Sequence, residues 1–391
     1  MSSNSISMIG WGHTKFGKHT EETVETLVVK AINEALEHAG IEASEVDEAF
    51  IGHFNAGFSQ QDFTSSLVLQ ASEDLRFIPV TRVENACATG TAAIHAGATA
   101  IESGRAKTVL VVGVEKMTEV SGREAGAVLA RASYVQEESE IPSFAHVFAE
   151  VAKAYFDKYG DNTDALARIA VKNHANGMSN PLAHFHKEVN FDFCFNESEA
   201  NPLVAPPLKR SDCSPITDGA AAVVLRSSDD LGSAKRAVAL KARSHVNDYL
   251  PMSRREMWHL EGCERAWQKA LSQANLNIKD LGLVETHDCF TIAELMQYEA
   301  MGLTEKGQGK KAIEEGWTTK EGILPVNASG GLKSKGHPIG ATGVSMHVMT
   351  AAQLVGEAGE MQLASNPTLG GVFNMGGSGV VSYCSILERI K

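Results

Sequence analysis

The stretch AINEALEHAGI at residues 31–41 decides the interpretation of the fold, because AWQKALSQANL at residues 266–276 repeats its pattern. Alanines and aliphatic residues fall at matching places in both stretches under one constant offset along the chain. Each stretch leads into a short loop and a strand-like run, AFIGH at 49–53 and VETHD at 284–288. The apolar spacing therefore predicts an amphipathic helix followed by a strand in each half of the chain.

A second pair of segments repeats in the same order. CATG at 87–90 opens a helix of small residues before a buried strand at 109–114, and GATG at 340–343 opens the corresponding helix of the second half. Strand-like runs at 371–373 and 380–383 follow that helix. Any two α/β segments can look alike, but two matches in one order favour an internal duplication. Alternating strands and helices predict an α/β fold with parallel or mixed sheets and helices on their faces.

The duplication predicts two domains of ordinary size within the 391 residues. We place the N-terminal half at residues 1–235 and the C-terminal half at 236–391. The stretch from about 118 to 208 differs from both halves, because it combines polar helices with prolines and a loop-like run. We interpret it as an insertion that covers one half like a lid, after which DGAAAVVL at 218–225 returns to a core strand.

Composition excludes several classes of function. A formal net charge of -13 argues against nucleic acid and anionic membranes as partners. We expect no secretion signal, because no basic region followed by an apolar run opens the sequence, and the longest apolar runs have only strand length. Six scattered cysteines without a CxxC pair are typical of free thiols. The expectation is a cytoplasmic protein without a membrane anchor or a metal site.

The segment ENACATGTAA places Cys87 where a strand turns into a helix of small residues. The free backbone N–H groups and the positive dipole end of such a helix stabilise a thiolate. This position can lower the pKa of a cysteine from about 8.5 by one or more units. The alternative interpretation is a core cysteine beside a tight turn, and position alone does not separate the two.

The glycine-rich segment NASGGLKSKGHPIG at 327–340 holds His337 between a flexible glycine and a proline. Histidine is the natural base for a thiol near neutral pH. The segment leads into the helix that mirrors the Cys87 helix, so the internal symmetry predicts that His337 lies near Cys87. A phosphate-binding loop is the alternative, but the segment has no GxxxxGK[ST] pattern.

Two further segments carry candidate site residues. ETHDCFT at 285–291 presents His287 and Cys289 after a predicted strand, where α/β proteins place their sites, and too few ligands lie nearby for zinc. GGVFNMGGSG at 370–379 provides turns whose N–H groups suit an oxyanion.

Together these segments resemble the thiolase superfamily over nearly the whole chain. The signatures are ENACATG, GHPIGATG and SPITDGAAA, and the run HDCF is similar to that of sterol-carrier-type and archaeal-type thiolases, which are acetyl-CoA C-acyltransferases. The resemblance implies a duplicated five-layered α-β-α-β-α fold with an inserted lid.

The resemblance also implies roles for the reactive residues. Cys87 would attack an acyl thioester, and His337 would activate its sulfur and later polarise a thioester oxygen. Other thiolases take a second catalytic cysteine from a Cys-x-Gly motif near the C-terminus, whereas this chain has NMG at 374–376. Members with HDCF use the cysteine of that motif instead, which makes Cys289 the acid and base.

Two thioester oxygens develop negative charge in such a reaction, so two oxyanion sites are implied. His287 with His337 would form one, and the backbone N–H groups of Cys87 and Gly376 would form the other. Asn374, at the place of the missing cysteine, is a secondary candidate.

The implied activity is a reversible Claisen condensation of acetyl-CoA with an acyl-CoA, or the CoA-dependent cleavage of a 3-ketoacyl-CoA, in lipid and fatty acid metabolism. It needs no cofactor beyond coenzyme A thioesters. The family implies a homodimer or homotetramer, and some relatives work with a small OB-fold protein partner.

Two rival functions remain at this stage. A decarboxylating ketoacyl synthase could use Cys87, His337 and Asn374 as a Cys-His-Asn set and would not need Cys289. A catalytically weak thiolase-fold subunit of a larger complex is supported only by the missing late cysteine.

Overall fold

The computed structural model describes residues 5–391, and within that range nine strands form one mixed sheet. The strands of this sheet are β1 (Ile6–His13), β2 (Glu48–Gly52), β3 (Val80–Val83), β4 (Thr108–Glu115), β7 (Gly219–Ser227), β8 (Val238–Asn247), β9 (Val284–Thr286), β10 (Leu369–Gly376) and β11 (Val381–Arg389). Their order across the sheet is β3-β2-β4-β7-β1-β8-β11-β10-β9. A separate small hairpin consists of β5 (Leu203–Ala205) and β6 (Leu208–Lys209).

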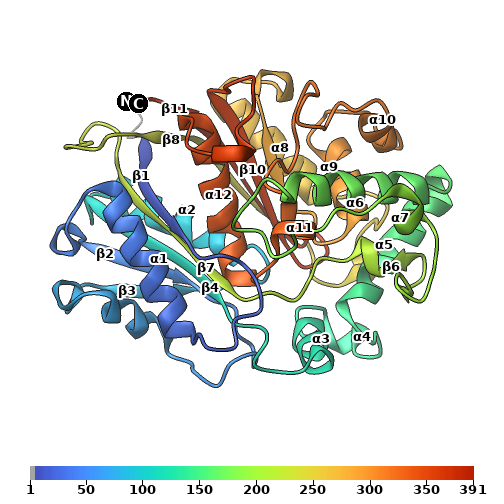
Figure 1. Ribbon diagram of the computed structural model, residues 1–391, viewed down its shortest axis with the longest axis horizontal. Coiled ribbons are helices and arrows are strands. Elements are labelled where there is room, and N and C mark those ends of the chain that lie inside the picture. The colour runs from blue at the N-terminus through green and yellow to red at the C-terminus, as the bar shows by residue number, and fades with distance from the viewer. Residues whose placement is uncertain (1–4) are drawn as a thin grey trace.

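Helices cover both faces of the sheet (Figure 1). They are α1 (Val24–Ala39), α2 (Thr89–Glu102), α3 (Gly122–Ala130), α4 (Val135–Glu138), α5 (Phe144–Tyr159), α6 (Thr163–Gly177), α7 (Phe191–Phe195), α8 (Glu261–Ala274), α9 (Thr291–Ala300), α10 (Gly309–Glu314), α11 (Gly331–Lys335) and α12 (Ile339–Val355). Within residues 5–391 none of them is both long and apolar enough to cross a membrane.

The strand order confirms the predicted duplication. From the centre outward, one half runs β1-β7-β4-β2-β3, with two antiparallel pairings followed by two parallel ones. The other half runs β8-β11-β10-β9 with the same directions. A parallel bridge from Val284 to Val326 takes the position that corresponds to β3, the fifth strand of the first half. The halves meet where Ser7 and Met8 of β1 pair with β8.

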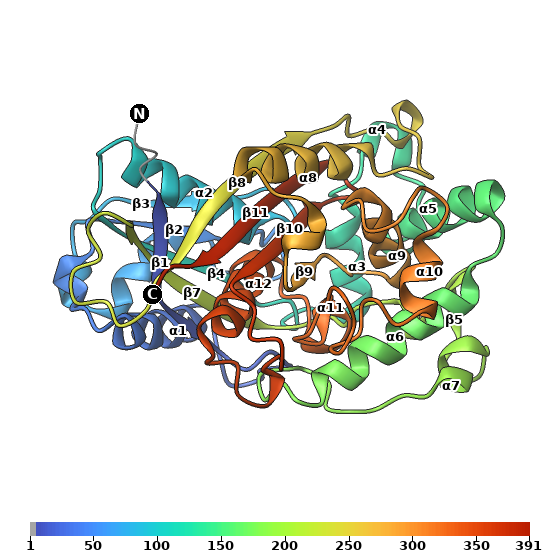
Figure 2. The same cartoon turned by 90° about the horizontal axis from the view of Figure 1, so that it is seen from above.

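The helices form the outer and central layers of a five-layered fold. Helix α1 packs on β1 and β7 outside the first half, and α8 packs on β8 and β11 outside the second (Figure 2). Helix α12 contacts α2 and strands of both halves, so these two helices form the central layer. The repeated helices also end alike, because Gly40 after α1 and Asn275 after α8 both adopt the left-handed conformation.

Two glycines bring the N-terminal ends of α2 and α12 into contact. A Cβ on Gly90 would lie 2.7 Å from the backbone nitrogen of Val344, and one on Gly343 would lie 2.2 Å from that of Thr91. Real side chains do not approach so closely, so glycine is required at both positions. The repeated CATG and GATG sequences therefore set the separation of the two helix ends that carry the site.

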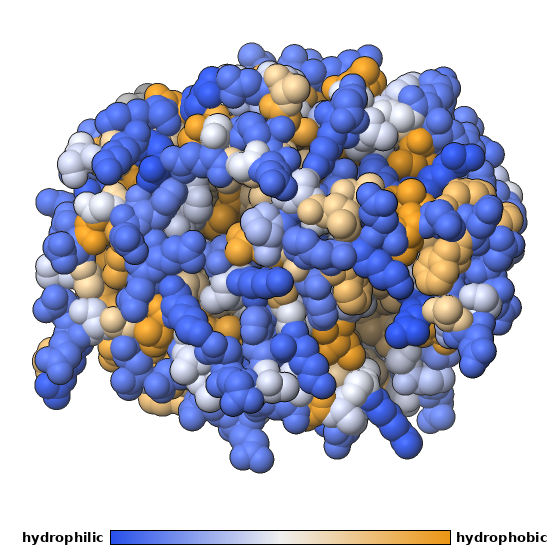
Figure 3. All heavy atoms as spheres, viewed as in Figure 1, coloured by the Kyte–Doolittle hydropathy of each residue, from blue (hydrophilic) through white to orange (hydrophobic). Residues whose placement is uncertain are grey.

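The segment between β4 and β7 holds α3 to α7 and the small hairpin (Figure 2). Helix α6 packs against α9 and α11 of the second half, while α5 contacts α9. This segment therefore covers the end of the sheet where α2 and α12 begin. On the face drawn in Figure 3, hydrophilic residues predominate and hydrophobic ones are scattered.

Candidate active site

Cys87 lies directly before α2, at the end of the loop that leaves β3, as the sequence predicted. Burial raises the pKa of its thiol to about 12, and the carboxylates of Glu115 and Glu84 add to the rise. The backbone N–H groups of Gly377 and of Cys87 itself lower the pKa and oppose this rise only in part. The expectation of a thiolate stabilised by the helix end was therefore wrong, because desolvation outweighs the N–H groups. The resting residue is a neutral thiol that needs a base.

His337 has its proton placed by a neighbouring hydroxyl. The hydroxyl of Thr342 donates to the carbonyl of Pro338 at 3.0 Å, so its oxygen accepts from Nδ1–H of His337 at 2.7 Å. Nε2 then carries the lone pair, and this buried atom has no partner within the described residues. Burial, with Lys335 adding, lowers the pKa of His337 to about 3, so the ring is neutral. It is a proton acceptor at Nε2.

The structure brings three of the predicted residues into contact range. The Cys87 sulfur and one ring nitrogen each from His287 and His337 all lie within 4.8 Å of one another. The two imidazole rings stand nearly perpendicular, at 87°, with centroids 5.1 Å apart. Residues from both halves of the duplication therefore meet at one point, although they are distant in sequence.

Cys289 lines the same cavity as Cys87 and His337, which measures about 260 Å³. Most of its other lining is apolar: Met117, Leu129, Phe144, Ile216 and Phe290. Burial, followed by the nearby Cys87 and Asp288, raises the pKa of the Cys289 thiol well above its usual value. The cavity thus presents the neutral thiols of Cys87 and Cys289 and the neutral imidazole of His337 in mostly apolar surroundings.

A third thiol in this cavity went unnoticed in the sequence. Cys213 also lines it, and burial raises the pKa of Cys213 to about 12. The backbone N–H of Ser214 donates to the carbonyl of Cys289 at 2.9 Å and so joins the segments that carry Cys213 and Cys289. Cys213 directly precedes the SPITDGAAA signature, and that position is the signal that could have identified it.

Asp288 is a second residue that sequence reasoning missed. Its carboxylate accepts the backbone N–H groups of Leu332 at 2.6 Å and Lys333 at 3.1 Å, and the side-chain amide of Asn173 at 2.7 Å. These bonds tie the end of β9, which carries His287 and Cys289, to the segment that leads to His337. Burial and the nearby Glu294 raise the pKa of Asp288 to about 7.

The buried carboxylate of Glu115 plays a similar part on the opposite side. It accepts the N–H groups of Phe54, Asn55 and, at the start of α12, Gly340 at 3.0 Å. A carboxylate at a helix N-terminus is favourable because it meets unpaired N–H groups. Glu115, at the end of β4 in the first half, therefore holds the α12 end of the second half in place.

Asn374 and the turn after it come close to Cys87. The amide of Asn374 contacts the carbonyl of Cys87 at 3.0 Å and Nδ1 of His287 at 2.9 Å. Gly376 makes room for the Cys87 loop, since a Cβ there would lie 2.7 Å from the carbonyl oxygen of Asn85. The backbone N–H groups that lower the pKa of the Cys87 thiol are those of Gly377, one residue beyond Gly376, and of Cys87 itself. The role of Gly376 as an oxyanion donor stays a prediction.

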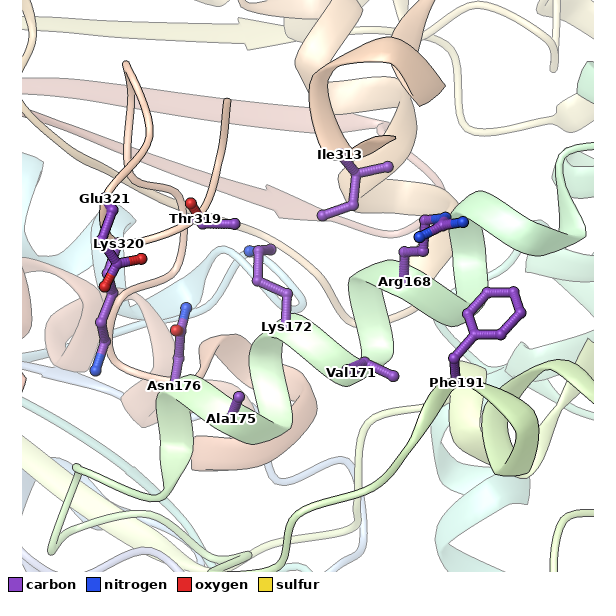
Figure 4. Close-up of a pocket in the computed structure, with 10 residues that line it drawn as sticks. All are labelled: Arg168, Val171, Lys172, Ala175, Asn176, Phe191, Ile313, Thr319, Lys320 and Glu321. Atoms are coloured by element: carbon purple, nitrogen blue, oxygen red, sulfur yellow. The ribbon is translucent and has the colours of Figure 1, made fainter. Parts of the chain in front are cut away.

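A larger cavity of about 470 Å³ lies apart from this site and shares no lining residue with it. Figure 4 shows Arg168 and Lys172 of α6 on one side, with Ile313 and the segment 319–321 across from them. Lys172 is already paired with Glu294 at 2.8 Å, so it is not a free cation for a ligand.

The fold is that of an enzyme on a duplicated α/β scaffold, in which a thiol and two imidazoles converge at one buried point. The family model for the N-terminal domain of thiolase matches residues 6–229, and that for the thiolase C-terminal domain matches residues 244–389. This chain belongs to the thiolase family and is an acyltransferase of that family.

Relatives and solved structures agree with this membership. The acetyl-CoA acetyltransferase of Methanothermobacter thermautotrophicus is 36% identical over 98% of this chain and 99% of its own length. Human sterol carrier protein 2 is 32% identical over 92% of this chain and 67% of its own length. The structure of human mitochondrial 3-ketoacyl-CoA thiolase matches with a TM-score of 0.76 at 15% sequence identity, over 99% of each chain. A structure described as Ltp2-ChsH2(DUF35) aldolase matches with a TM-score of 0.85 at 22% identity, over 99% of this chain and 98% of the other.

Proposed function

We propose that this thiolase transfers acyl groups between coenzyme A thioesters and acetyl-CoA through an acyl-cysteine on Cys87. The proposal depends on one observation, the convergence of the Cys87 sulfur with ring nitrogens of His337 and His287 within 4.8 Å. The names of the acetyl-CoA acetyltransferase relatives support acetyl-CoA as one substrate. Coenzyme A thioesters are the only small molecules that the proposed reaction requires.

The first half-reaction uses the lone pair on Nε2 of His337. This nitrogen takes the proton of the Cys87 thiol as the sulfur attacks the thioester carbon, which is how a neutral thiol becomes nucleophilic. The C–S bond to coenzyme A breaks, and the leaving thiolate takes a proton from Cys289. The products are an acyl-cysteine, free coenzyme A, a protonated His337 and a Cys289 thiolate.

The second half-reaction returns these protons. The Cys289 thiolate removes a proton from the methyl carbon of acetyl-CoA, and the enolate attacks the acyl carbon on Cys87. The Cys87 sulfur leaves and takes the proton held by His337, so all three groups regain their starting states. The raised pKa of Cys289 favours the second step, because a high-pKa thiol forms a strongly basic thiolate.

Stabilisation of the two thioester oxygens is assigned to separate groups. His287 and the protonated His337 would face the oxygen of the enolate, and backbone N–H groups of Cys87 and the 376–377 turn would face that of the acyl-cysteine. Removing one such donor typically costs 10² to 10³ in rate.

We further propose a homodimer or homotetramer in a reducing, cytoplasmic setting. Strand β3 leaves one edge of the sheet unpaired, and Phe77 (85% exposed) and Phe63 (77%) lie in the segments before it. Free thiols at all six cysteines support the compartment. A small OB-fold partner is proposed from the family resemblance, and light scattering of the chain alone and with that partner tests both assemblies.

The deciding experiment measures CoA-dependent cleavage of 3-ketoacyl-CoA substrates of increasing chain length, with mass spectrometry of the acylated protein. The wild-type chain is expected to release acetyl-CoA and to carry an acyl group on Cys87, and Cys87→Ser is expected to do neither. A wild-type chain without cleavage or adduct would revive the non-catalytic subunit. Malonyl-CoA decarboxylation that survives Cys289→Ser would favour the ketoacyl synthase.

A further inference from the structure

The orientation of the Asn374 side chain is fixed by its surroundings. The carbonyl oxygen of Cys87 can only accept a hydrogen bond, so the atom that faces it at 3.0 Å must be the amide nitrogen. The hydroxyl of Thr91 in turn donates to the amide oxygen at 2.9 Å. A flipped amide would set two oxygens against each other, so the arrangement has one solution.

This orientation determines where His287 carries its proton. The second N–H of the Asn374 amide points at Nδ1 of His287, 2.9 Å away, and Nδ1 must therefore accept. Burial, with His337 adding, lowers the pKa of His287 well below its usual value, so the ring is neutral and holds a single proton. That proton lies on Nε2, a buried atom with no protein partner among the described residues.

The two imidazoles beside Cys87 thus differ in what their Nε2 atoms offer. Thr342 leaves His337 with a lone pair at Nε2, and Asn374 leaves His287 with an N–H at Nε2. One ring is suited to take the proton of the thiol, and the other is suited to donate to an oxygen.

We propose that Asn374 is a positioning residue that locks His287 in its Nε2–H form, so that His287 donates to the substrate oxygen and cannot serve as a metal ligand. The donor role rests on the proposed function. The tautomer and the exclusion of metal stand on the geometry alone.

The exclusion of metal follows from the same hydrogen bonds. A cysteine sulfur and two imidazole nitrogens within 4.8 Å form a ligand set that zinc prefers. Zinc would need the lone pair of His287 at Nε2, which moves the proton to Nδ1 and sets it against the N–H of Asn374. An acceptor at position 374 removes this conflict, since a carboxylate that accepts from the far ring nitrogen strengthens a histidine ligand.

The first test reads the tautomer in the wild-type protein. Nitrogen NMR of the full chain with ¹⁵N-labelled histidine, assigned by loss of one ring signal in His287→Gln, is expected to show His287 protonated at Nε2. A ring protonated at Nδ1, or at both nitrogens near neutral pH, would overturn the proposal. This result is independent of activity, so an inactive chain with an Nε2–H ring would defeat the proposed function and leave the lock intact.

The second test uses zinc ion as the probe, with binding measured by competition against a chelating dye. Asn374→Asp is expected to bind zinc at least about tenfold more tightly than the wild type. Asn374→Leu, which removes the amide without adding an acceptor, is the matched control and should not reach that gain. The gain should vanish in Asn374→Asp combined with His287→Gln. Equal zinc affinity in the wild type and Asn374→Asp would refute the exclusion of metal, and a merely structural role for Asn374 predicts that equality.

Discussion

Gly343→Ala is expected to separate the two helix ends and so to disable the site without touching a reactive group. The new Cβ would lie 2.2 Å from the backbone nitrogen of Thr91 and 2.5 Å from the amide oxygen of Asn374. Ordinary contact begins near 3.4 Å, so α12 and α2 must part by ~1.2 Å, the difference between 3.4 and 2.2. Overpacking of a core costs about 1–3 kcal/mol or more, and here backbone atoms cannot turn aside. A displacement of about 1 Å can lower the rate 10²-fold.

The assay compares thermal unfolding and kcat/KM for thiolysis in Gly343→Ala and in Gly122→Ala. Gly122 lies at the start of α3, and a Cβ there meets only Ile216, at 4.0 Å, so this control should resemble the wild type. We expect Gly343→Ala to lose both stability and about two orders of magnitude in kcat/KM. If Gly343→Ala keeps the wild-type melting temperature and a kcat/KM within threefold of the wild type, the claim that the close contact of α12 with α2 positions the site is refuted.

Three further perturbations test other parts of the site. Cys289→Ser should still form the acyl-cysteine from an acyl-CoA, detected by mass spectrometry, because that step forms no enolate. Cleavage of a 3-ketoacyl-CoA should fall by about 10² to 10⁴, because the departing enolate lacks the acid that protonates it; unchanged cleavage would remove this thiol from the mechanism. Asp288→Ala should destabilise the protein by about 2–5 kcal/mol in urea, because it leaves buried N–H groups unpaired, and Asp288→Asn should recover only part of the loss. Burial lowers the pKa of His13 and His337 to about 3 and of His347 to about 4, so these rings take up protons only on unfolding as the pH falls below 6.5. Each should therefore reduce the free energy of unfolding by up to about 1.4 kcal/mol per pH unit below that pH. Asp288, whose pKa is raised to about 7, takes up its proton in the folded state and opposes this loss only in part. A free energy of unfolding in urea that stays constant between pH 7 and 5 would contradict the expectation.

The sequence predicted the fold because the evidence for it is local and repeated. Alanine and aliphatic spacing identified α1 and α8, and the two small-residue helices after CATG and GATG identified the central layer. The same symmetry predicted that Cys87 and His337 lie together, since each stands beside the start of one central helix. The convergence of these residues could therefore be anticipated without coordinates.

The chemistry within the site depends on contacts that no local pattern contains. The protonated state of Cys87 follows from burial between two halves, and the opposing effect of the Gly377 N–H depends on how the turn after β10 meets the Cys87 loop. Asp288 acts on a segment more than forty residues later in the chain, and Asn374 acts on residues from both halves. Such side chains are identified only once packing has placed their partners.

The meeting of the two helix ends at Gly90 and Gly343 also brings together groups that are encoded in different halves of the chain. In the proposed mechanism the nucleophile Cys87 lies in the first half, whereas the second thiol and both imidazoles, one of them the base, lie in the second. A first half on its own would therefore hold Cys87 without the imidazole that is proposed to activate it. Severing the connection between β7 and β8 should yield two silent fragments whose turnover returns only on recombination.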